Sequence, residues 1–138
     1  MKLTEHFSLS ELEVTSTGLV NKIPDFNTLQ NLYDICLSLE FIRASIALRA
    51  KKDLPIRITS GYRSSEVNKA VGGVSNSAHL KGCAVDITCD DFDLLLKAID
   101  DVRQYRVDFD QIIIYRERKF VHFGISQSSV SRKQVLYK

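Results

Sequence analysis

Two histidines and an aspartate are the residues of this sequence whose types could bind a metal ion together. His79 and Asp86 lie seven positions apart in the stretch SNSAHLKGCAVDIT, and His122 lies in FVHF. Two imidazoles and one carboxylate leave a zinc ion with residual positive charge and an open fourth position, as catalysis requires. Such an ion activates water and polarises a scissile carbonyl. The set therefore predicts one Zn²⁺ ion and hydrolase chemistry.

Each part of this set has a more ordinary interpretation when it is taken alone. A histidine on a strand is more often a hydrogen-bonded structural residue than a metal ligand. An aspartate beside a loop can cap a turn, and a His-x6-Asp spacing also arises by chance. A metal-free scaffold of helices and sheet therefore stays open as an alternative at this point.

The alternation of residues along two predicted strands places the candidate ligands on one side of a sheet. In CAVDITC, residues 83–89, the odd-numbered apolar residues share one face, whereas Asp86 lies on the other face beside the small Ala84. In FVHFGI, residues 120–125, His122 lies opposite the apolar odd-numbered residues in the same way. If the strands lie close together, both ligands point away from the core.

Helical periodicity predicts the elements that support this sheet. Apolar residues recur at helical spacing over residues 28–50, which indicates the main amphipathic helix. A second helix begins at Asp90 and Asp91, whose charges suit the N-terminal end of a helix dipole. Serine and glutamate at capping-box spacing indicate a short helix over residues 8–14.

The remaining segments complete an α+β fold with a small, mainly antiparallel sheet flanked by helices. Residues 56–59 alternate as a strand, and QIIIY and KFVHFGI form a hairpin with a charged turn. The Gly-, Ser- and Asn-rich stretch between the first two strands is long for a loop, which is typical of functional loops. We expect one domain over residues 1–138, with 127–138 as a loose polar tail that makes an apolar contact at Val135 and Leu136.

Composition excludes several classes of partner and site. With 19 basic and 17 acidic residues the chain has no strong field for nucleic acid or anionic lipid, and no stretch is apolar enough to span a bilayer. We therefore expect a monomer with no nucleic-acid or membrane partner. No signal peptide is recognisable, which predicts synthesis in the cytoplasm and action in the cell wall only after release. Three cysteines without CxxC spacing argue against a disulfide framework or a thiolate zinc site and are expected to be buried.

The sequence around the candidate ligands resembles that of a known family. ITSGYRSSEVNKAVGG, SAHLKGCAVDI, FDQII and FVHF are together similar to the zinc D-Ala-D-Ala carboxypeptidases, a family that includes L-alanyl-D-glutamate endopeptidases and shares its fold with the Hedgehog signalling domain. The resemblance covers about residues 5–126 and is closest to the compact branch found in phages and bacteria. It implies a Hedgehog/DD-peptidase-like fold.

Site residues follow from the resemblance position by position. His79, Asp86 and His122 match the zinc ligands. Arg63 matches an arginine that binds the substrate near the scissile bond and stabilises the developing oxyanion, although it could also hold the long loop through a salt bridge. Ser77 matches a residue that hydrogen-bonds the substrate, although a loop serine can simply cap a turn.

One position departs from the family pattern. Such enzymes carry an acidic general base three residues before the last ligand, and here that residue is Lys119, which cannot accept a proton while it is charged. Glu117, two residues earlier, could take over this role if the turn is kinked or shifted in register. Asp110, in the FDQ motif, is expected to support the site rather than to bind the metal.

The combined interpretation is a zinc peptidase that hydrolyses peptide bonds in peptidoglycan stem peptides. It could act as a carboxypeptidase or as an endopeptidase, and a phage endolysin fits both. The alternative is a catalytically impaired, zinc-binding homologue that serves as a cell-wall or phage structural binding module, with Lys119 marking the lost base.

Overall fold

A five-stranded sheet forms the centre of the computed structural model, which describes residues 1–138. The strand order is β1-β2-β4-β3-β5, with antiparallel pairing throughout except between β3 and β5, which are parallel. The strands are β1 (Ile56–Ser60), β2 (Ala84–Cys89), β3 (Gln111–Tyr115), β4 (Phe120–Gly124) and β5 (Gln134–Tyr137). The predicted α+β class with a mainly antiparallel sheet is confirmed.

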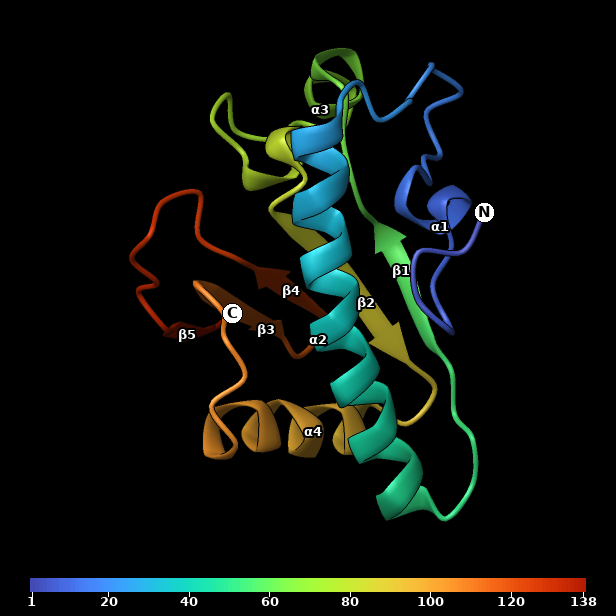
Figure 1. Cartoon of the computed structure of the whole chain (residues 1–138), viewed down its shortest axis with the longest axis vertical. Coiled ribbons are helices and arrows are strands. Elements are labelled where there is room, and N and C mark those ends of the chain that lie inside the picture. Colours follow the sequence, from blue (N-terminus) through green and yellow to red (C-terminus); the bar gives the residue numbers. More distant parts are fainter.

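Two long helices pack against this sheet: in Figure 1, α2 crosses in front of the strands and α4 lies below them. Helix α2 (Phe26–Ala50) begins where the Asp25 side chain accepts a hydrogen bond from the backbone N–H of Thr28, and α4 (Phe92–Gln104) begins at Asp91 in the same way. Both helices agree with the predicted segments. The sheet's other face carries no helix of comparable length.

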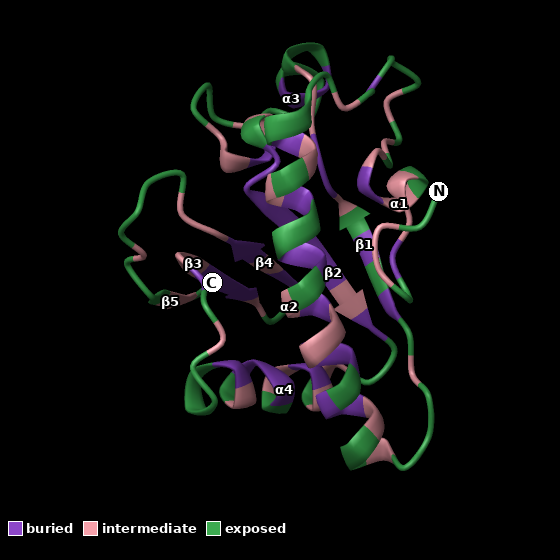
Figure 2. Cartoon of the chain, viewed as in Figure 1, coloured by how far each residue is buried: buried purple, intermediate pink, exposed green.

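The core lies between these helices and the sheet (Figure 2). It combines the buried stripes of α2 and α4 with the inward residues of the strands. From the strands it takes Ile56, Ile58, Val85, Ile87, Cys89, Ile112, Ile114, Val121 and Phe123. Side chains alternate across a strand, so filling this core turns the intervening residues of β2 and β4 toward the opposite face.

Three short helices lie around the end of the sheet where β2 begins and beside β1. They are α1 (Leu9–Leu12), α3 (Ser65–Ala70) and the 3₁₀ helix η1 (Ala78–Lys81). The predicted capping box is present in α1, where the Ser8 N–H donates to Glu11 Oε1 at 3.0 Å. The predicted long loop is therefore partly ordered, with α3 and η1 inside it.

The N-terminal segment is attached to the sheet at the end of β1. The Tyr62 N–H donates to the carbonyl oxygen of Leu12 at 2.8 Å, and a Cβ built on Gly61 would lie 2.4 Å from that same oxygen. Only a glycine allows this close approach of the two backbones. Residues 1–12 are thereby held directly against the peptide unit that follows β1.

The end of the chain differs from its expectation as a loose tail. Residues 134–137 form β5 and pair in parallel with β3, with Val135 opposite Ile112 and Leu136 opposite Ile113. Val135 packs against the core, so the predicted apolar contact exists, but it belongs to a strand of the sheet. A four-residue strand flanked by polar residues gives too short an alternation to be recognised from sequence.

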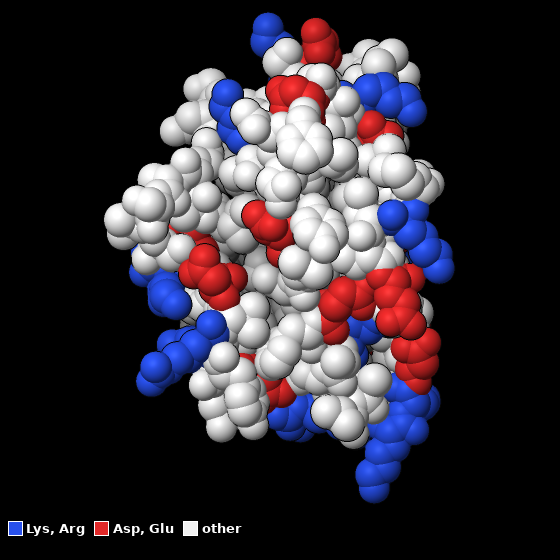
Figure 3. Space-filling model, in the orientation of Figure 1, with Lys and Arg blue, Asp and Glu red and all other residues white.

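The distribution of charged side chains and the burial of the cysteines agree with what the composition predicts. The face drawn in Figure 3 carries acidic and basic side chains in small groups of each sign, in keeping with a formal net charge of +2. Cys36, Cys83 and Cys89 are buried and unpaired, and burial raises the pKa of Cys36 to about 12. None of the helices combines the length and the apolar character that crossing a bilayer requires.

A polar contact joins α2 to α4 across their exposed edge. Asp101 on α4 accepts hydrogen bonds from Arg49 Nη2 at 2.8 Å and from the Ser45 hydroxyl, both on α2. These bonds hold the pKa of the Asp101 carboxyl below its ordinary value. The contact stabilises the packing of the two helices as long as this carboxyl is ionised.

We expect Asp101→Asn to lower the free energy of unfolding by about 1 kcal/mol at neutral pH, because a charge-assisted contact is lost. The pKa is depressed in the folded state, so this stabilisation is present above about pH 4 and disappears as the pH falls through the folded pKa. Urea unfolding followed by circular dichroism at several pH values measures it. Asp100→Asn, at an exposed neighbour with no side-chain partner, is the control. A difference between wild type and Asp101→Asn that stays constant into acid would contradict this assignment.

Candidate metal centre

His79, Asp86 and His122 converge on the sheet face that α2 and α4 leave open. Each offers a ligand atom, and all these atoms lie within 4.8 Å of one another. His122 Nδ1 lies 3.0 Å from Asp86 Oδ1, and His79 Nε2 lies 3.5 Å from the same oxygen. His79 and Asp86 are buried, with exposed fractions of 2% and 9%. The structure thus brings together all three residues that the sequence indicated as ligands.

The register of β2 and β4 positions two of the three residues. Asp86 and His122 are direct partners in this antiparallel pair, flanked by the pairs Val85–Phe123 and Ile87–Val121, whose side chains fill the core. Directly opposed residues bring their side chains within contact distance on one face. The hydrophobic register therefore sets the contact between Asp86 and His122.

The third residue comes from η1, and its imidazole is held in one orientation. His79 Nδ1 lies 2.7 Å from the carbonyl oxygen of Gly61. A carbonyl oxygen can only accept, so Nδ1 carries a proton, and in the neutral ring Nε2 is the nitrogen left to bind a metal. That nitrogen points at Asp86. A hydrogen bond of this kind from a ligating histidine fixes its tautomer and orients the ring for metal binding.

The turn after η1 depends on a glycine that touches the beginning of α2. Gly82 ends η1 in the left-handed region at φ 71°. A Cβ at this position would lie 2.8 Å from both the carbonyl oxygen and Cγ2 of Thr28. The absence of a side chain therefore allows the chain to turn from His79 into β2 while it packs against the helix.

The electrostatics of the cluster favour an ionised aspartate. Burial alone would raise the pKa of Asp86, but hydrogen bonds with His122 and His79 outweigh burial and hold this pKa well below its ordinary value. The carboxylate is therefore charged across the physiological range and available as a metal ligand.

Zinc fits these residues by donor type and by spacing. Two imidazole nitrogens and a carboxylate oxygen are common zinc ligands, and bonds of about 2.1 Å in a tetrahedron put neighbouring ligand atoms about 3.4 Å apart. The two contacts of Asp86 Oδ1, at 3.0 and 3.5 Å, bracket that value. His79, Asp86 and His122 could therefore hold one zinc ion without a large rearrangement.

Arg63 approaches Asp86 from the side away from the histidines. Its Nη2 lies 3.6 Å from Asp86 Oδ2. Its Nε donates to the Ser60 hydroxyl at 3.1 Å and its Nη1 to Asn68 Oδ1 at 3.3 Å. A bulge in β1 sets Ser60 opposite Asp86. Burial lowers the pKa of Arg63, and the Asp86 charge opposes that effect. The guanidinium is thus fixed beside the candidate ligands.

Ser77 lies at the start of η1 and lines the cavity above the cluster. Its hydroxyl accepts a hydrogen bond from the His79 N–H at 3.3 Å, so it caps this short helix. A role in binding substrate remains a prediction, since one hydroxyl can cap the helix and still donate a hydrogen bond to a ligand.

Two open cavities meet at the cluster. The larger, of about 920 Å³, contains both histidines and Asp86, and the smaller, of about 660 Å³, extends from Asp86 toward β1. Arg63, Asp86, Arg118 and Phe120 contribute to both. A ligand lying across Asp86 could therefore extend to either side.

Glu117 does not line either cavity. It is exposed in the turn of residues 116–119 between β3 and β4. Lys119 adopts a left-handed φ of 56° in that turn, and its carbonyl oxygen accepts a hydrogen bond from the Thr88 hydroxyl at 2.7 Å. A role of Glu117 as general base therefore requires the turn to change conformation and stays a prediction.

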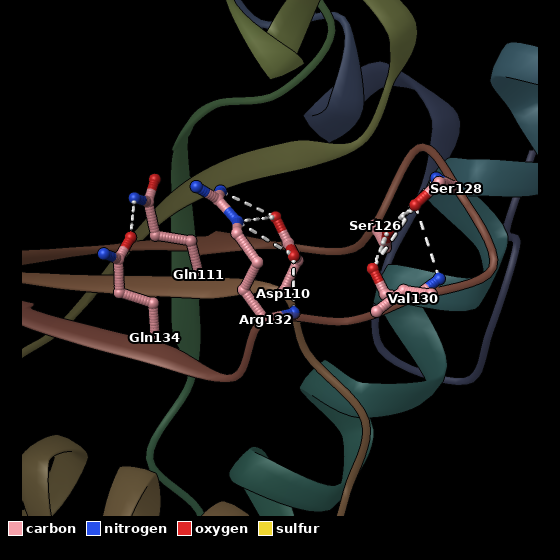
Figure 4. Close-up of polar contacts among 7 residues, drawn as sticks. All are labelled: Asp110, Gln111, Ser126, Ser128, Val130, Arg132 and Gln134. Atoms are coloured by element: carbon pink, nitrogen blue, oxygen red, sulfur yellow. Dashed lines mark hydrogen bonds and ion pairs between the residues drawn. The ribbon is translucent and has the colours of Figure 1, made fainter.

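Sequence reasoning did not identify the loop that follows β4 as a wall of the larger cavity. Asp110 accepts hydrogen bonds from Nε and Nη2 of Arg132, at 2.8 Å for the shorter, and from the Arg132 N–H at 2.9 Å (Figure 4). Gln111 and Gln134 bond beside them at 2.6 Å. Asp110 thus fixes the loop to the sheet edge. The FDQ motif indicated a supporting aspartate, but nothing in the sequence identified its partner.

We expect Gly82→Ala to lower the free energy of unfolding by about 3 kcal/mol, because it combines left-handed backbone strain with a clash against Thr28. Gly18→Ala is the matched control. Gly18 has a similar φ of 78° but nothing within 4 Å of the added Cβ, so we expect only about 1 kcal/mol from strain. Chemical denaturation of the wild type and the two variants measures both losses of unfolding free energy. Equal losses in the two variants would show that the contact with α2 is unimportant.

Comparison with known proteins agrees with this geometry. A family model described as peptidase M15 matches residues 5–124, which include Arg63, Ser77 and all three candidate ligands. A search of curated proteins found no match. The family match covers most of the sheet and both long helices, so the chain belongs to the peptidase M15 family of zinc DD-peptidases.

Proposed function

We propose that this protein is a zinc peptidase that hydrolyses peptide bonds in peptidoglycan stem peptides, with one zinc ion held by His79, Asp86 and His122. The observation that carries the proposal is the convergence of these residues in an open cavity, with Nε2 of His79, the ring nitrogen that does not contact Gly61, directed at Asp86. Family membership supports the reaction class. Its place of action would be the cell wall, after release from the cytoplasm.

Zinc in such a site supplies Lewis acidity toward a carbonyl and activates water. The protein's own residues would position the peptide. Arg63 is fixed beside Asp86 by Ser60 and Asn68, so its guanidinium can bind the substrate carbonyl and stabilise negative charge that develops on its oxygen. Ser77, on the cavity wall, would hydrogen-bond the peptide backbone.

The mechanism also requires a proton acceptor for the attacking water. The acidic residues lining the larger cavity are Asp86 and Asp110, and each is already bound to basic side chains. We propose that Glu117 reaches the substrate when the turn of residues 116–119 rearranges on binding. Because no regular element holds Glu117, this movement requires no unfolding of the sheet.

A zinc-binding module without catalytic activity is the second candidate. It is favoured by Lys119, which occupies the position expected for the base, and by the exposure of Glu117. Both candidates retain the three ligands, so metal binding alone does not distinguish them. Turnover of a peptide substrate does.

We expect His79→Ala and His122→Ala to lose stoichiometric zinc, because removal of one ligand from three leaves an incomplete site. Metal analysis after dialysis against a weak chelator measures the zinc content. His6→Ala is the matched control, because the third histidine of the chain lies outside the cluster and pairs with Glu40. Full retention of zinc by both ligand variants would refute the site.

Incubation of the zinc-loaded protein with purified peptidoglycan is expected to release new amino groups, and His122→Ala is expected to release none.

We expect Glu117→Gln to lower turnover by about 100-fold, since general base catalysis contributes about that much or more. Unchanged turnover would remove Glu117 from the mechanism. No release by the fully loaded wild type would favour the binding module.

A further inference from the structure

Arg118 is a cation at the junction of the two cavities with no acidic partner. It lines both of them and forms no hydrogen bond or ion pair within the protein. The other arginines of these walls are all paired with carboxylates: Arg57 with Asp90, Arg63 with Asp86 and Arg132 with Asp110. Among the arginines of the two cavity walls, Arg118 is therefore the one that has no carboxylate partner.

An aromatic contact holds this guanidinium next to the metal centre. Its Cζ lies 5.0 Å from the centre of the Phe120 ring, and Phe120 stacks on Tyr115 at 4.3 Å. Phe120 and His122 share one face of β4, and residues two apart on a strand lie about 7 Å from each other. A ring stacked in this way can support a guanidinium while leaving its N–H groups accessible.

The charge at this rim favours an anionic ligand. Lys119, the next residue along the chain, contributes to the smaller cavity and also has no ion-pair partner. The acids of both walls are engaged by arginines or histidines. A planar guanidinium with accessible donors matches a carboxylate, which it can bind through two parallel hydrogen bonds.

We propose that Arg118 is a specificity-determining residue that binds a carboxylate of the peptide substrate, separately from the carbonyl that Arg63 would take. The inference rests on the proposed function, because it assumes that a peptide lies across Asp86. It assigns the charged turn between β3 and β4 to substrate selection. Peptides that carry a carboxylate within reach of Phe120 would be preferred over their carboxamides.

The test compares charge variants of enzyme and substrate together. The probe is an N-acetylated stem peptide, L-alanyl-γ-D-glutamyl-L-lysyl-D-alanyl-D-alanine, and two analogues in which either the D-glutamate α-carboxylate or the C-terminal carboxylate is an amide. We expect one amidation to lower kcat/KM of the wild type by about 10-fold or more, the effect of one charged hydrogen-bonded contact. Arg118→Gln should lose this discrimination, and Arg118→Lys should keep part of it.

Arg116→Gln is the matched control. Arg116 lies in the same exposed turn and stacks on the Tyr137 ring at 5.3 Å, but it lines neither cavity of the metal centre. It should discriminate as the wild type does. A general disturbance of the turn would lower the rates for all three peptides together without changing their ratio.

The outcomes separate this inference from the proposed function. Suppose that the wild type cleaves the peptides and that Arg118→Gln prefers the carboxylate over the amides to the same degree. This result would overturn the role of Arg118 and leave the peptidase proposal intact. If the wild type cleaves none of the peptides, the peptidase proposal fails, and calorimetric binding of the same peptides to the zinc-loaded proteins decides the role of Arg118. Binding about 10-fold weaker in Arg118→Gln for the carboxylate form alone would support it, and equal binding would overturn it.

Discussion

Asp86 and His122 face each other across β2 and β4, and a shift of either strand by one residue would turn its ligand into the core. The alternate positions of both strands are filled by Val85, Ile87, Val121 and Phe123, which pack beneath α2 and α4. Burial of these side chains is the force that holds the register. The metal centre is therefore positioned by hydrophobic packing on the other side of the same strands, and the helices matter to the chemistry although they do not touch it.

Strand alternation made the position of Asp86 and His122 on one face predictable, whereas His79 came from the loop before β2 and from the family resemblance. Apolar residues at every second position of CAVDITC and FVHFGI settle which face each side chain takes, so Asp86 and His122 could be placed before the structure was known. An acidic residue likewise indicated the start of α4 at Asp91, whereas α2 was predicted from its periodicity alone and begins after a cap at Asp25, slightly before the predicted residue 28. Strand β5 was missed because its four residues offer little alternation and its pairing with β3 is a long-range contact.

The direction of side chains in turns could not be predicted from the sequence. Glu117 and Arg118 are neighbours in a four-residue turn, and both are exposed to solvent, but only Arg118 lines the cavities at the metal centre. That difference arises from a left-handed residue at Lys119 and from the stacking of Arg118 on Phe120. Turn conformation follows from local backbone energies of a few kcal/mol or less, which residue types alone do not resolve. The arginine–carboxylate pairs on the cavity walls could not be predicted for a different reason: each pair joins residues that are distant in sequence.

The peptide unit after β1 has a further consequence. The Gly61 carbonyl fixes the proton of His79, and the Leu12 carbonyl, which closes over Gly61, accepts a hydrogen bond from the next N–H along the chain. One stretch of backbone therefore serves both the docked N-terminal segment and the imidazole of the metal centre. Loosening of the first dozen residues would remove one of the contacts that hold this peptide unit in place. If that contact restrains the imidazole of His79, thermodynamic linkage requires metal binding to strengthen the attachment of the N-terminal segment by the same free energy.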